Sequence, residues 1–520
     1  MILNILAVSA EAFPLAKTGG LGDAVSGLCR ALQRGGRVHV TLMLPAYAGV
    51  LEQIDRVRAC ARLEGLAGGP VTLLTGILPA LGLRVLLVQC DALYGRPGIY
   101  ADPDGTEYED NALRFATLAQ AAARVAQGVP GVPRPDIVHA HDWHAALVPL
   151  YLRQQRTHTV KTLLTLHNIA FQGAFPLEQA DRLGIEARFR GEDGAGLRGQ
   201  LNFLKAGIRY ADLMTVVSRN YAREILTPQF GCGLEDVLKA RTGASIAIPN
   251  GIDVSVWDPQ ADEYLPGLGF HSRDMRNKAV CKRLLQSCFG LQPDEGATVL
   301  ALGSRITGQK MADVAVRALP EALNSHPALQ VCVIGRGEKA LEEAFAALAR
   351  QYPGRCAVQI GFQEPQAHLL HAGADILLHG SRFEPFGLTP LYAMRYGTIP
   401  IGSRVGGMAD TIRDPGGAGG PEAMRFATVL LFDGEEVGDM VAAIGRAMAL
   451  RRQSDLWQAM RSNAMRTDFS WAQTEPRYVR AYQALCPTGR DIPASQAAVP
   501  MRDHAARRSD PSVQPAWTGA

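Results

Sequence analysis

The sequence lacks a marked excess of either charge. Lysine and arginine number 53 against 50 for aspartate and glutamate, so the formal net charge is only +3. Surfaces that bind nucleic acid or anionic membranes carry a clear basic excess. We therefore expect neither nucleic acid nor a membrane as a partner, and any positive charge that serves a function has to be placed locally.

Long apolar runs and paired cysteines are also missing. No uninterrupted apolar stretch approaches the roughly 20 residues of a membrane span, and no basic segment precedes an apolar core at the N-terminus. The nine cysteines are scattered and form no C-x-x-C pair. These absences predict reduced thiols, a cytoplasmic protein and no cysteine-based zinc site.

What is present is the composition of a folded protein of several domains. With 47% hydrophobic and 20% charged residues, wholesale disorder is excluded. A chain of 520 residues exceeds one ordinary core. Beyond Cys486 the apolar periodicity ends and proline, serine, alanine and arginine dominate, so we expect residues 487–520 to form a disordered tail.

Strand-like apolar runs alternate with helix-like segments in two series, one from residue 2 to 248 and the other from 298 to 431. This alternation predicts an α/β protein with two doubly wound, Rossmann-like domains. Prolines and glycines near 251–269 indicate the boundary. We predict one domain at 1–255 and a second at 256–486, whose final helix crosses back to the first. Facing domains of this kind would enclose a central cleft at the carboxyl ends of their strands.

A glycine-rich loop follows the first apolar run. The segment K-T-G-G-L-G-D at 17–23 leads directly into a helix-like stretch. The N–H groups around Gly19 and Gly20 can approach a phosphate closely, the helix start adds a favourable dipole, and Lys17 supplies a full positive charge. The spacing matches neither the Walker A loop nor the dinucleotide fingerprint. It therefore predicts a cradle for an anionic sugar donor, with a ligand-free turn as the alternative.

A pair of cations marks the first such loop in the second half. The segment G-S-R-I-T-G-Q-K at 303–310 places Arg305 and Lys310 on one turn before a helix. A charge contact at about 4 Å and an effective dielectric of about 20 is worth on the order of 4 kcal/mol before desolvation. Two such contacts to one diphosphate would favour its departure as a leaving group. The alternative is that both cations are simply solvated.

Two further loops follow predicted strands. The segment at 381–392 combines Glu384, an acceptor for sugar or ribose hydroxyls, with Gly387 and Thr389 before a helix start that suits a phosphate. The segment at 405–411 is another glycine turn that opens a helix. For this second loop, anion binding and packing are equal alternatives.

Histidines cluster in the first half, and they invite a metal interpretation. The segment H-A-H-D-W-H at 139–144 lacks the H-E-x-x-H arrangement of a zinc helix. The D-x-D at 102–104 contains proline and is followed by glycine, which favours an ordinary turn. We therefore expect no metal and no other cofactor. Asp142 and His167 are better candidates for contacts with sugar hydroxyls.

Taken together, these segments resemble the bacterial glycogen synthases and plant starch synthases that use ADP-glucose. The matching segments appear in the family's order and cover residues 1 to about 485. They are K-T-G-G-L-G-D (17–23), H-A-H-D-W-H-A (139–145), H-N-I-A-F-Q-G (167–173), P-N-G-I-D-V-S-V-W-D-P (249–259), S-R-I-T-G-Q-K (304–310), S-R-F-E-P-F-G-L (381–388) and G-G-M-A-D-T (406–411).

The resemblance implies a GT-B fold and transfer of glucose from ADP-glucose to the non-reducing end of an α-1,4-glucan such as glycogen, with retention of the anomeric configuration. The catalytic residues that it implies are Asp142, His167, Arg305, Lys310 and Glu384. The substrate-binding residues that it implies are Lys17, Gly19, Gly20, Tyr94, Asn250, Phe362, Gly387, Leu388 and Thr389. No motif specifies an oligomeric state or a regulatory ligand.

Four positions depart from the family pattern. Phe386 stands where the bacterial enzymes commonly have cysteine, so no thiol can act there. Phe362 replaces the usual tyrosine, which keeps stacking on adenine but removes a hydroxyl contact. Met311 stands in place of glycine after Lys310, and the segment at 218–220 lacks the expected proline. These last two changes concern only local geometry.

Other functions remain as alternatives. Broader GT-B transferases often carry E-x7-E, but the eighth residue after Glu384 is Tyr392. Glucan phosphorylases need a lysine-bound pyridoxal cofactor, and no segment resembles their lysine site. A non-enzymatic glucan-binding protein would be expected to lose the cations, which are present. The choice of ADP over UDP follows from the resemblance alone.

Overall fold

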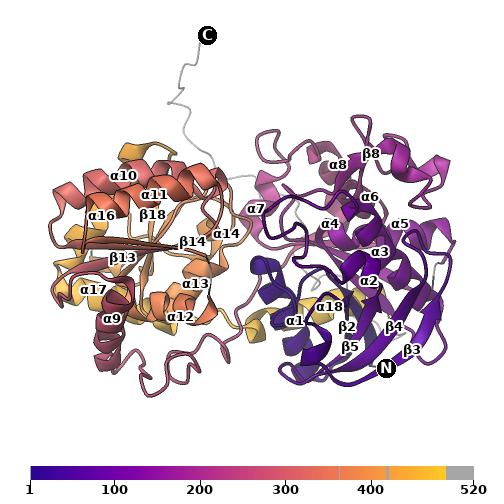
Figure 1. Cartoon of the computed structure of the whole chain (residues 1–520), viewed down its shortest axis with the longest axis horizontal. Helices are drawn as coiled ribbons and strands as arrows, with labels where there is room; N and C mark the ends of the chain where they lie inside the picture. Colours follow the sequence, from indigo (N-terminus) through magenta and orange to yellow (C-terminus); the bar gives the residue numbers. More distant parts are fainter. Residues whose placement is uncertain (1, 158, 362, 417–420, 488–520) are drawn as a thin grey trace, which may run out of the picture.

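The computed structural model describes residues 2–157, 159–361, 363–416 and 421–487, and it contains two α/β lobes side by side (Figure 1). We call residues 2–250 the N-lobe and residues 276–466 the C-lobe. The expected tail from 488 onward and Phe362 lie outside the described residues. Within the described ranges, no helix has the length and apolar character needed to cross a bilayer.

The N-lobe is built on a nine-stranded sheet in the order β12-β11-β7-β6-β1-β2-β5-β4-β3. The strands from β12 to β5 run parallel, as the sequence predicts, whereas β3 and β4 add an antiparallel edge. The bounds are β1 (Leu3–Val8), β2 (Val38–Pro45), β3 (Asp55–Leu63), β4 (Val71–Leu78), β5 (Leu83–Gln89), β6 (Ile137–His141), β7 (Lys161–Leu166), β11 (Leu213–Val216) and β12 (Ser245–Ala247).

Helices cover both faces of this sheet, and a small antiparallel sheet of β8 (Ala174–Pro176), β10 (Gln200–Asn202) and β9 (Gly196–Leu197) lies beside it. The helices are α1 (Gly20–Gly35), α2 (Asp91–Tyr94), α3 (Asn111–Gln127), α4 (Asp142–Ala145), α5 (Leu147–Gln154), α6 (Phe203–Tyr210), α7 (Arg219–Glu224) and α8 (Glu235–Ala240). Short 3-10 turns occur at Leu51–Gln53, Leu177–Ala180, Ala187–Phe189 and Thr242–Ala244.

The C-lobe sheet is parallel throughout, in the order β15-β14-β13-β16-β17-β18. Its strands are β13 (Thr298–Gly303), β14 (Leu329–Gly335), β15 (Cys356–Ile360), β16 (Ile376–His379), β17 (Ile399–Ser403) and β18 (Leu430–Phe432). The helices are α9 (Arg276–Phe289), α10 (Ala312–Ser325), α11 (Lys339–Gln351), α12 (Glu364–Gly373), α13 (Leu388–Arg395), α14 (Gly406–Thr411), α15 (Pro421–Met424), α16 (Val437–Arg451) and α17 (Ser454–Arg466), with a 3-10 turn at Gly308–Lys310.

Strand order identifies where ligands of such sheets bind. The winding direction reverses between β13 and β16 in the C-lobe and between β1 and β6 in the N-lobe. Doubly wound sheets bind ligands beyond the carboxyl ends of the strands at such a reversal. The loops after these four strands contain most of the residues that the sequence singles out, so the fold places them where a ligand is expected.

The last helix of the described residues, α18 (Trp471–Leu485), returns to the N-lobe and packs along α1 (Figure 1). The approach is close, because a Cβ added to Gly27 would lie 2.0 Å from Trp471 Nε1. Tyr482 adds a polar contact, with its hydroxyl 2.9 Å from His139 Nδ1. The chain therefore passes between the lobes more than once.

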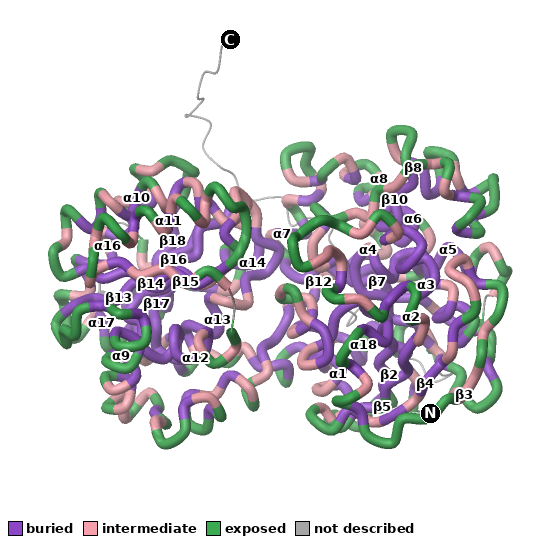
Figure 2. Tube along the Cα trace, in the orientation of Figure 1, coloured by how far each residue is buried: buried purple, intermediate pink, exposed green. Residues whose placement is uncertain are grey.

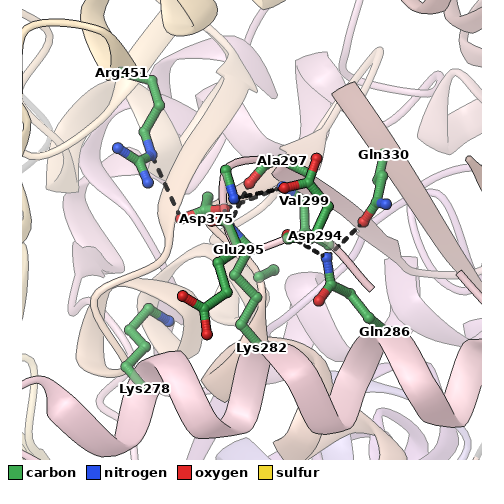
Figure 3. Close-up of polar contacts among 12 residues, drawn as sticks. Lys278, Lys282, Gln286, Asp294, Glu295, Ala297, Val299, Gln330, Asp375 and Arg451 are labelled. Carbon is green, nitrogen blue, oxygen red and sulfur yellow. Dashed lines mark hydrogen bonds and ion pairs between the residues drawn. The ribbon is translucent and has the colours of Figure 1, made fainter. Parts of the chain in front are cut away.

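Buried strands form the centre of both lobes (Figure 2), and the C-lobe core also contains charge. Asp375 lies between two cations, with Oδ2 2.8 Å from Lys282 Nζ and Oδ1 3.5 Å from Arg451 Nε (Figure 3). Burial raises the pKa of Asp375, but the two cations outweigh it and hold that pKa below its usual value. The cluster lies at the amino ends of β13 and β16, away from the ligand-binding edge, so we assign it a structural role.

Candidate functional site

The glycine-rich loop after β1 is organised by a carboxylate that the sequence analysis did not identify. Glu11 is only 3% exposed, and it accepts hydrogen bonds from Thr18 N (2.8 Å), Thr18 Oγ1 (2.8 Å) and Gly19 N (3.3 Å). It also accepts one from the Tyr100 hydroxyl at 2.6 Å. Because the Gly19 N–H is donated to Glu11, the N–H groups that face an anion have to come from the start of α1, at Gly20. In the sequence, the only indication of this role was an acidic residue between small residues shortly after a predicted strand.

Lys17 lies where the two lobes meet. Its Nζ is 3.0 Å from Asp23 Oδ1 in the N-lobe and 3.4 Å from Glu364 Oε2 in the C-lobe. Burial lowers the pKa of Lys17, but the two carboxylates outweigh it and the net shift is upward. Burial raises the pKa of Asp23 to about 6 against the opposing charge of Lys17. The predicted phosphate-binding lysine is thus held by acids from both lobes.

Other contacts also join the lobes. The Gly406 N–H donates to Glu224 Oε1 at 2.9 Å, and the Asn220 N–H donates to Asp410 Oδ2 at 2.6 Å. A Cβ added to Gly20 would lie 3.2 Å from Leu388 Cδ1. The structure therefore brings Gly20 and Leu388 together from opposite lobes, which the sequence analysis placed in one substrate-binding set.

Glu384 is the centre of the C-lobe part of the site. It is 7% exposed, and its Oε2 forms an ion pair with Lys310 and accepts from Ser381 Oγ at 3.0 Å. His379 Nε2 lies 2.9 Å from the same oxygen. Burial raises the pKa of Glu384, but Lys310 and His379 outweigh it and hold that pKa well below its usual value. Among the described residues all of these contacts use Oε2, so Oε1 is the oxygen available to a ligand hydroxyl.

Glycines after β17 allow the chain there to lie close to the loop that contains Glu384. Gly406 has φ +48°, and a Cβ there would lie 1.7 Å from the carbonyl oxygen of Glu384. The Gly407 N–H donates to that same carbonyl at 3.1 Å. Phe386 is 4% exposed, and its backbone lies close to Gly407. This observation favours a packing role for the glycine turn.

Arg305 is exposed and lies toward the N-lobe. Its Nη2 donates to Gln309 Oε1 at 2.7 Å, and its guanidinium is 5.9 Å from the ring centre of Phe171. Phe171, in the predicted sugar-contacting loop after β7, is 50% exposed. The neighbouring Arg382 is instead committed to ion pairs with Asp313 and Glu435. Of these two arginines, Arg305 is the one accessible to a ligand.

Asp142 and His167 are brought together by the ends of β6 and β7. Asp142 Oδ1 accepts from the backbone N–H groups of His167 (2.6 Å) and Asn168 (3.2 Å). Burial raises the pKa of Asp142 to about 7, with those two N–H groups opposing the shift. Burial lowers the pKa of His167 to about 3, so its imidazole is neutral near pH 7. The pair offers sugar hydroxyls one carboxyl group and one neutral ring.

The remaining candidates differ in accessibility. Tyr94 is 0% exposed and donates its hydroxyl to the Arg114 carbonyl at 2.6 Å, so this structure does not place it among the others. Asn250 is 7% exposed, and its Oδ1 has no hydrogen-bond partner among the described residues. Gly387 has φ +88° and caps α13, next to the partly exposed Leu388 and Thr389.

The described part of the chain contains no set of side chains arranged to bind a metal ion. No group of three or more histidine, cysteine, aspartate or glutamate side chains there has an arrangement that could hold an ion. The histidines of β6 and α4 contact other rings and hydroxyls instead. His139 Nε2, for example, lies 2.6 Å from Thr165 Oγ1.

Family models match both lobes: the starch synthase catalytic domain matches residues 4–240, and glycosyl transferases group 1 matches residues 289–465. A glycogen synthase of Bordetella parapertussis is 59% identical over 93% of this chain and 95% of that protein. One from Ralstonia nicotianae is 52% identical over 99% and 94%.

Solved structures agree with these matches. The catalytic domain of starch synthase IV from Arabidopsis thaliana, bound to ADP and acarbose, is 27% identical, with a TM-score of 0.85 over 93% of this chain and 99% of that one. An Anabaena protein in complex with UDP and glucose is 15% identical, with a TM-score of 0.55 over 93% and 100%, and this likeness concerns the fold alone.

Proposed function

Since this chain belongs to the family of bacterial glycogen synthases and plant starch synthases, we propose that it transfers glucose from ADP-glucose to the non-reducing end of an α-1,4-glucan with retention of configuration. It is a glucosyltransferase of GT-B fold that takes a nucleotide-sugar donor and a glucan acceptor. ADP as the nucleotide and glycogen as the acceptor are parts of the proposal, supported by the ADP and acarbose bound to starch synthase IV and by the names of the relatives.

The observation that carries the proposal is the ion pair of Lys310 with Glu384 beyond the strand-order reversal of the C-lobe. In the proposed complex Lys310 and Arg305 hold the diphosphate from the C-lobe, and Lys17 approaches it from the N-lobe. Charge that develops on the departing diphosphate is stabilised by cations that are already in place, which lowers the barrier without reorganisation.

The glucosyl unit then lies between the two lobes' polar groups. Glu384 Oε1 accepts a hydrogen bond from a sugar hydroxyl. Asp142, His167 and Asn250 contact the glucosyl ring from the N-lobe side. The C1–O bond to the diphosphate breaks as the acceptor hydroxyl oxygen bonds to C1 on the same face. The proton of that hydroxyl passes to the leaving diphosphate oxygen, so charge and atoms balance.

Labelled donors test this function. Purified protein is given glycogen with either ADP-[14C]glucose or UDP-[14C]glucose, in the presence of EDTA, and label in the polymer is counted. We expect transfer from the ADP donor, and release of the new label by an α-1,4-specific exo-glucanase. Transfer from the uridine donor alone would overturn the choice of nucleotide. Strict dependence on a divalent metal would overturn the role given to the cations, and glycogen binding without any transfer would indicate a glucan-binding protein.

A further inference from the structure

His141, the last residue of β6, lies between two other histidines. Its Nδ1 is 3.0 Å from His167 Nε2, and its ring centre is 4.1 Å from that of His139. His139 is itself held by Tyr482 and Thr165, at 2.9 and 2.6 Å. Since His141 is 0% exposed, its ring has a fixed position against His167.

The protonation pattern follows from which nitrogens have partners. The contact between the two rings needs one N–H, because two bare nitrogens would repel each other. Nε2 of His141 is buried and has no hydrogen-bond partner among the described residues. If His167 were the donor, the proton of neutral His141 would be on that nitrogen, and a buried N–H would be left unsatisfied. Orphaned buried N–H groups are rare, and one costs about 1 to 3 kcal/mol. His141 therefore carries its proton on Nδ1 and donates to His167.

We propose that His141 is a positioning residue that fixes neutral His167 as its Nδ1–H tautomer, so that His167 meets the glucosyl donor as a hydrogen-bond donor to a sugar oxygen. The use of this N–H on substrate rests on the function proposed above. His167 is partly exposed, and its Nδ1 has no hydrogen-bond partner in the described ranges, so this nitrogen is available to a ligand. Its backbone N–H is already donated to Asp142.

The low pKa values of His141 and His167 are the reason that the tautomer of His167 affects ligand binding. Burial lowers the pKa of His167 to about 3, and burial together with the other two histidines lowers that of His141 well below its usual value. A doubly protonated ring, which would donate from both nitrogens, is therefore excluded near neutral pH. Each ring has a single proton, and its location decides whether the ligand side of His167 donates or accepts.

Nitrogen NMR on protein labelled with 15N-histidine reads the tautomer directly. The His167 signals are assigned by their loss in His167→Gln. In the unliganded wild type we expect Nδ1 of His167 to be protonated and Nε2 bare. In His141→Leu, which cannot donate, we expect the Nε2–H form to become populated. His39→Leu, at an exposed position of β2, is the matched control and should leave the pattern unchanged.

Kinetics give the second readout. Loss of one neutral hydrogen bond corresponds to a fall of about threefold to tenfold in kcat/KM for His141→Leu. His141→Asn, whose amide can donate from a similar place, should recover most of this loss. A wild-type His167 with its proton on Nε2, or an unchanged tautomer in His141→Leu, would overturn the proposal. The wild-type spectrum decides even if that variant does not fold. Absence of glucosyl transfer with an Nδ1–H spectrum would count against the proposed function and leave the positioning role in place.

Discussion

At the scale of single residues, the cations expected to bind a diphosphate already have anionic or polar partners. Lys310 pairs with Glu384, Lys17 with Asp23 and Glu364, and Arg305 contacts Gln309. Such partners hold long, flexible side chains near the position of the leaving group. The diphosphate then has to share the two lysines with the protein's own carboxylates, so each lysine makes its main contribution when negative charge develops in the transition state.

Replacement of Lys310 tests this account. In Lys310→Ala the compensating charge is lost and Glu384 is left buried without its cation. We expect kcat to fall by about 10²-fold to 10³-fold, the usual cost of removing one preorganised electrostatic contact. Glycogen binding, measured by co-sedimentation, should change little. Lys339→Ala, at an exposed lysine at the start of α11, is the control. Near-normal turnover in Lys310→Ala would contradict the assigned role.

The raised pKa of Asp142 predicts a pH dependence with opposite signs for activity and stability. If the carboxylate contacts the donor, kcat/KM falls about tenfold per pH unit below about 7, the pKa of Asp142, and Asp142→Asn lacks this limb.

The stability of the protein changes with pH in the opposite direction. Because folding raises this pKa, the contribution of Asp142 is fully present below its unfolded value of 3.8 and is lost as the pH rises through about 7. We therefore expect the free energy of unfolding of Asp142→Asn, relative to that of the wild type, to be higher at pH 8 than at pH 5. Urea unfolding at the two pH values measures it.

At the scale of elements, the sequence predicted the parallel strands of both large sheets, which read as buried apolar runs, together with glycine loops that follow several of them. It did not predict the antiparallel edge of the N-lobe sheet. There β4 was missed although it is apolar, and β3 was missed because its side chains are mostly exposed and Arg56, Arg58 and Arg62 interrupt the apolar pattern. Glu11 was missed because its partners Thr18 and Tyr100 become evident only once the chain is folded.

The same limit applies to the candidate site. Glu384 and Lys310 were identifiable because each lies in a short motif after a strand. The contact between Glu364 and Lys17 depends on how distant elements meet, and no local pattern encodes that meeting. Tyr94 was assigned to the sugar by its place in the family pattern, whereas the fold turns its hydroxyl toward the Arg114 carbonyl.

The turn between β17 and α14 gives a prediction at this scale. In Gly406→Ala the new Cβ meets the Glu384 carbonyl at 1.7 Å and the backbone is forced to keep φ +48°. We expect the free energy of unfolding to fall by about 2 kcal/mol or more and activity to fall as the 381–388 loop shifts. Gly438→Ala in α16 is the matched control, because nothing lies within 4 Å of its Cβ and the helix gains up to about 1 kcal/mol. Calorimetry measures the stability of each variant, and initial rates measure its activity. Equal melting temperatures of the two variants would contradict the packing role of Gly406.

At the scale of the whole molecule, the lobes meet through polar contacts, while α18 follows the C-lobe in sequence and packs on the N-lobe. The contacts between Lys17 and Glu364 and between Glu224 and Gly406 each join a carboxylate to a donor across the interface. Polar interfaces within a chain permit relative motion of the domains. We therefore expect the lobes to separate and close, with the diphosphate able to replace Glu364 as the partner of Lys17.

Glu364→Gln tests that exchange, because it removes the negative charge from the lobe contact while keeping the size of the side chain. Ion pairs at the protein surface contribute about 0.2 to 1 kcal/mol. With that range as the guide, KM for ADP-glucose should fall by up to about fivefold as Lys17 loses a competing partner. The radius of gyration of the unliganded protein, measured by small-angle X-ray scattering, should rise, and addition of ADP should reverse the rise. Glu343→Gln, on the exposed face of α11, is the control and should change neither value. A higher KM with unchanged scattering would instead mean that Glu364 orients Lys17 for the donor, and the exchange of partners would be ruled out.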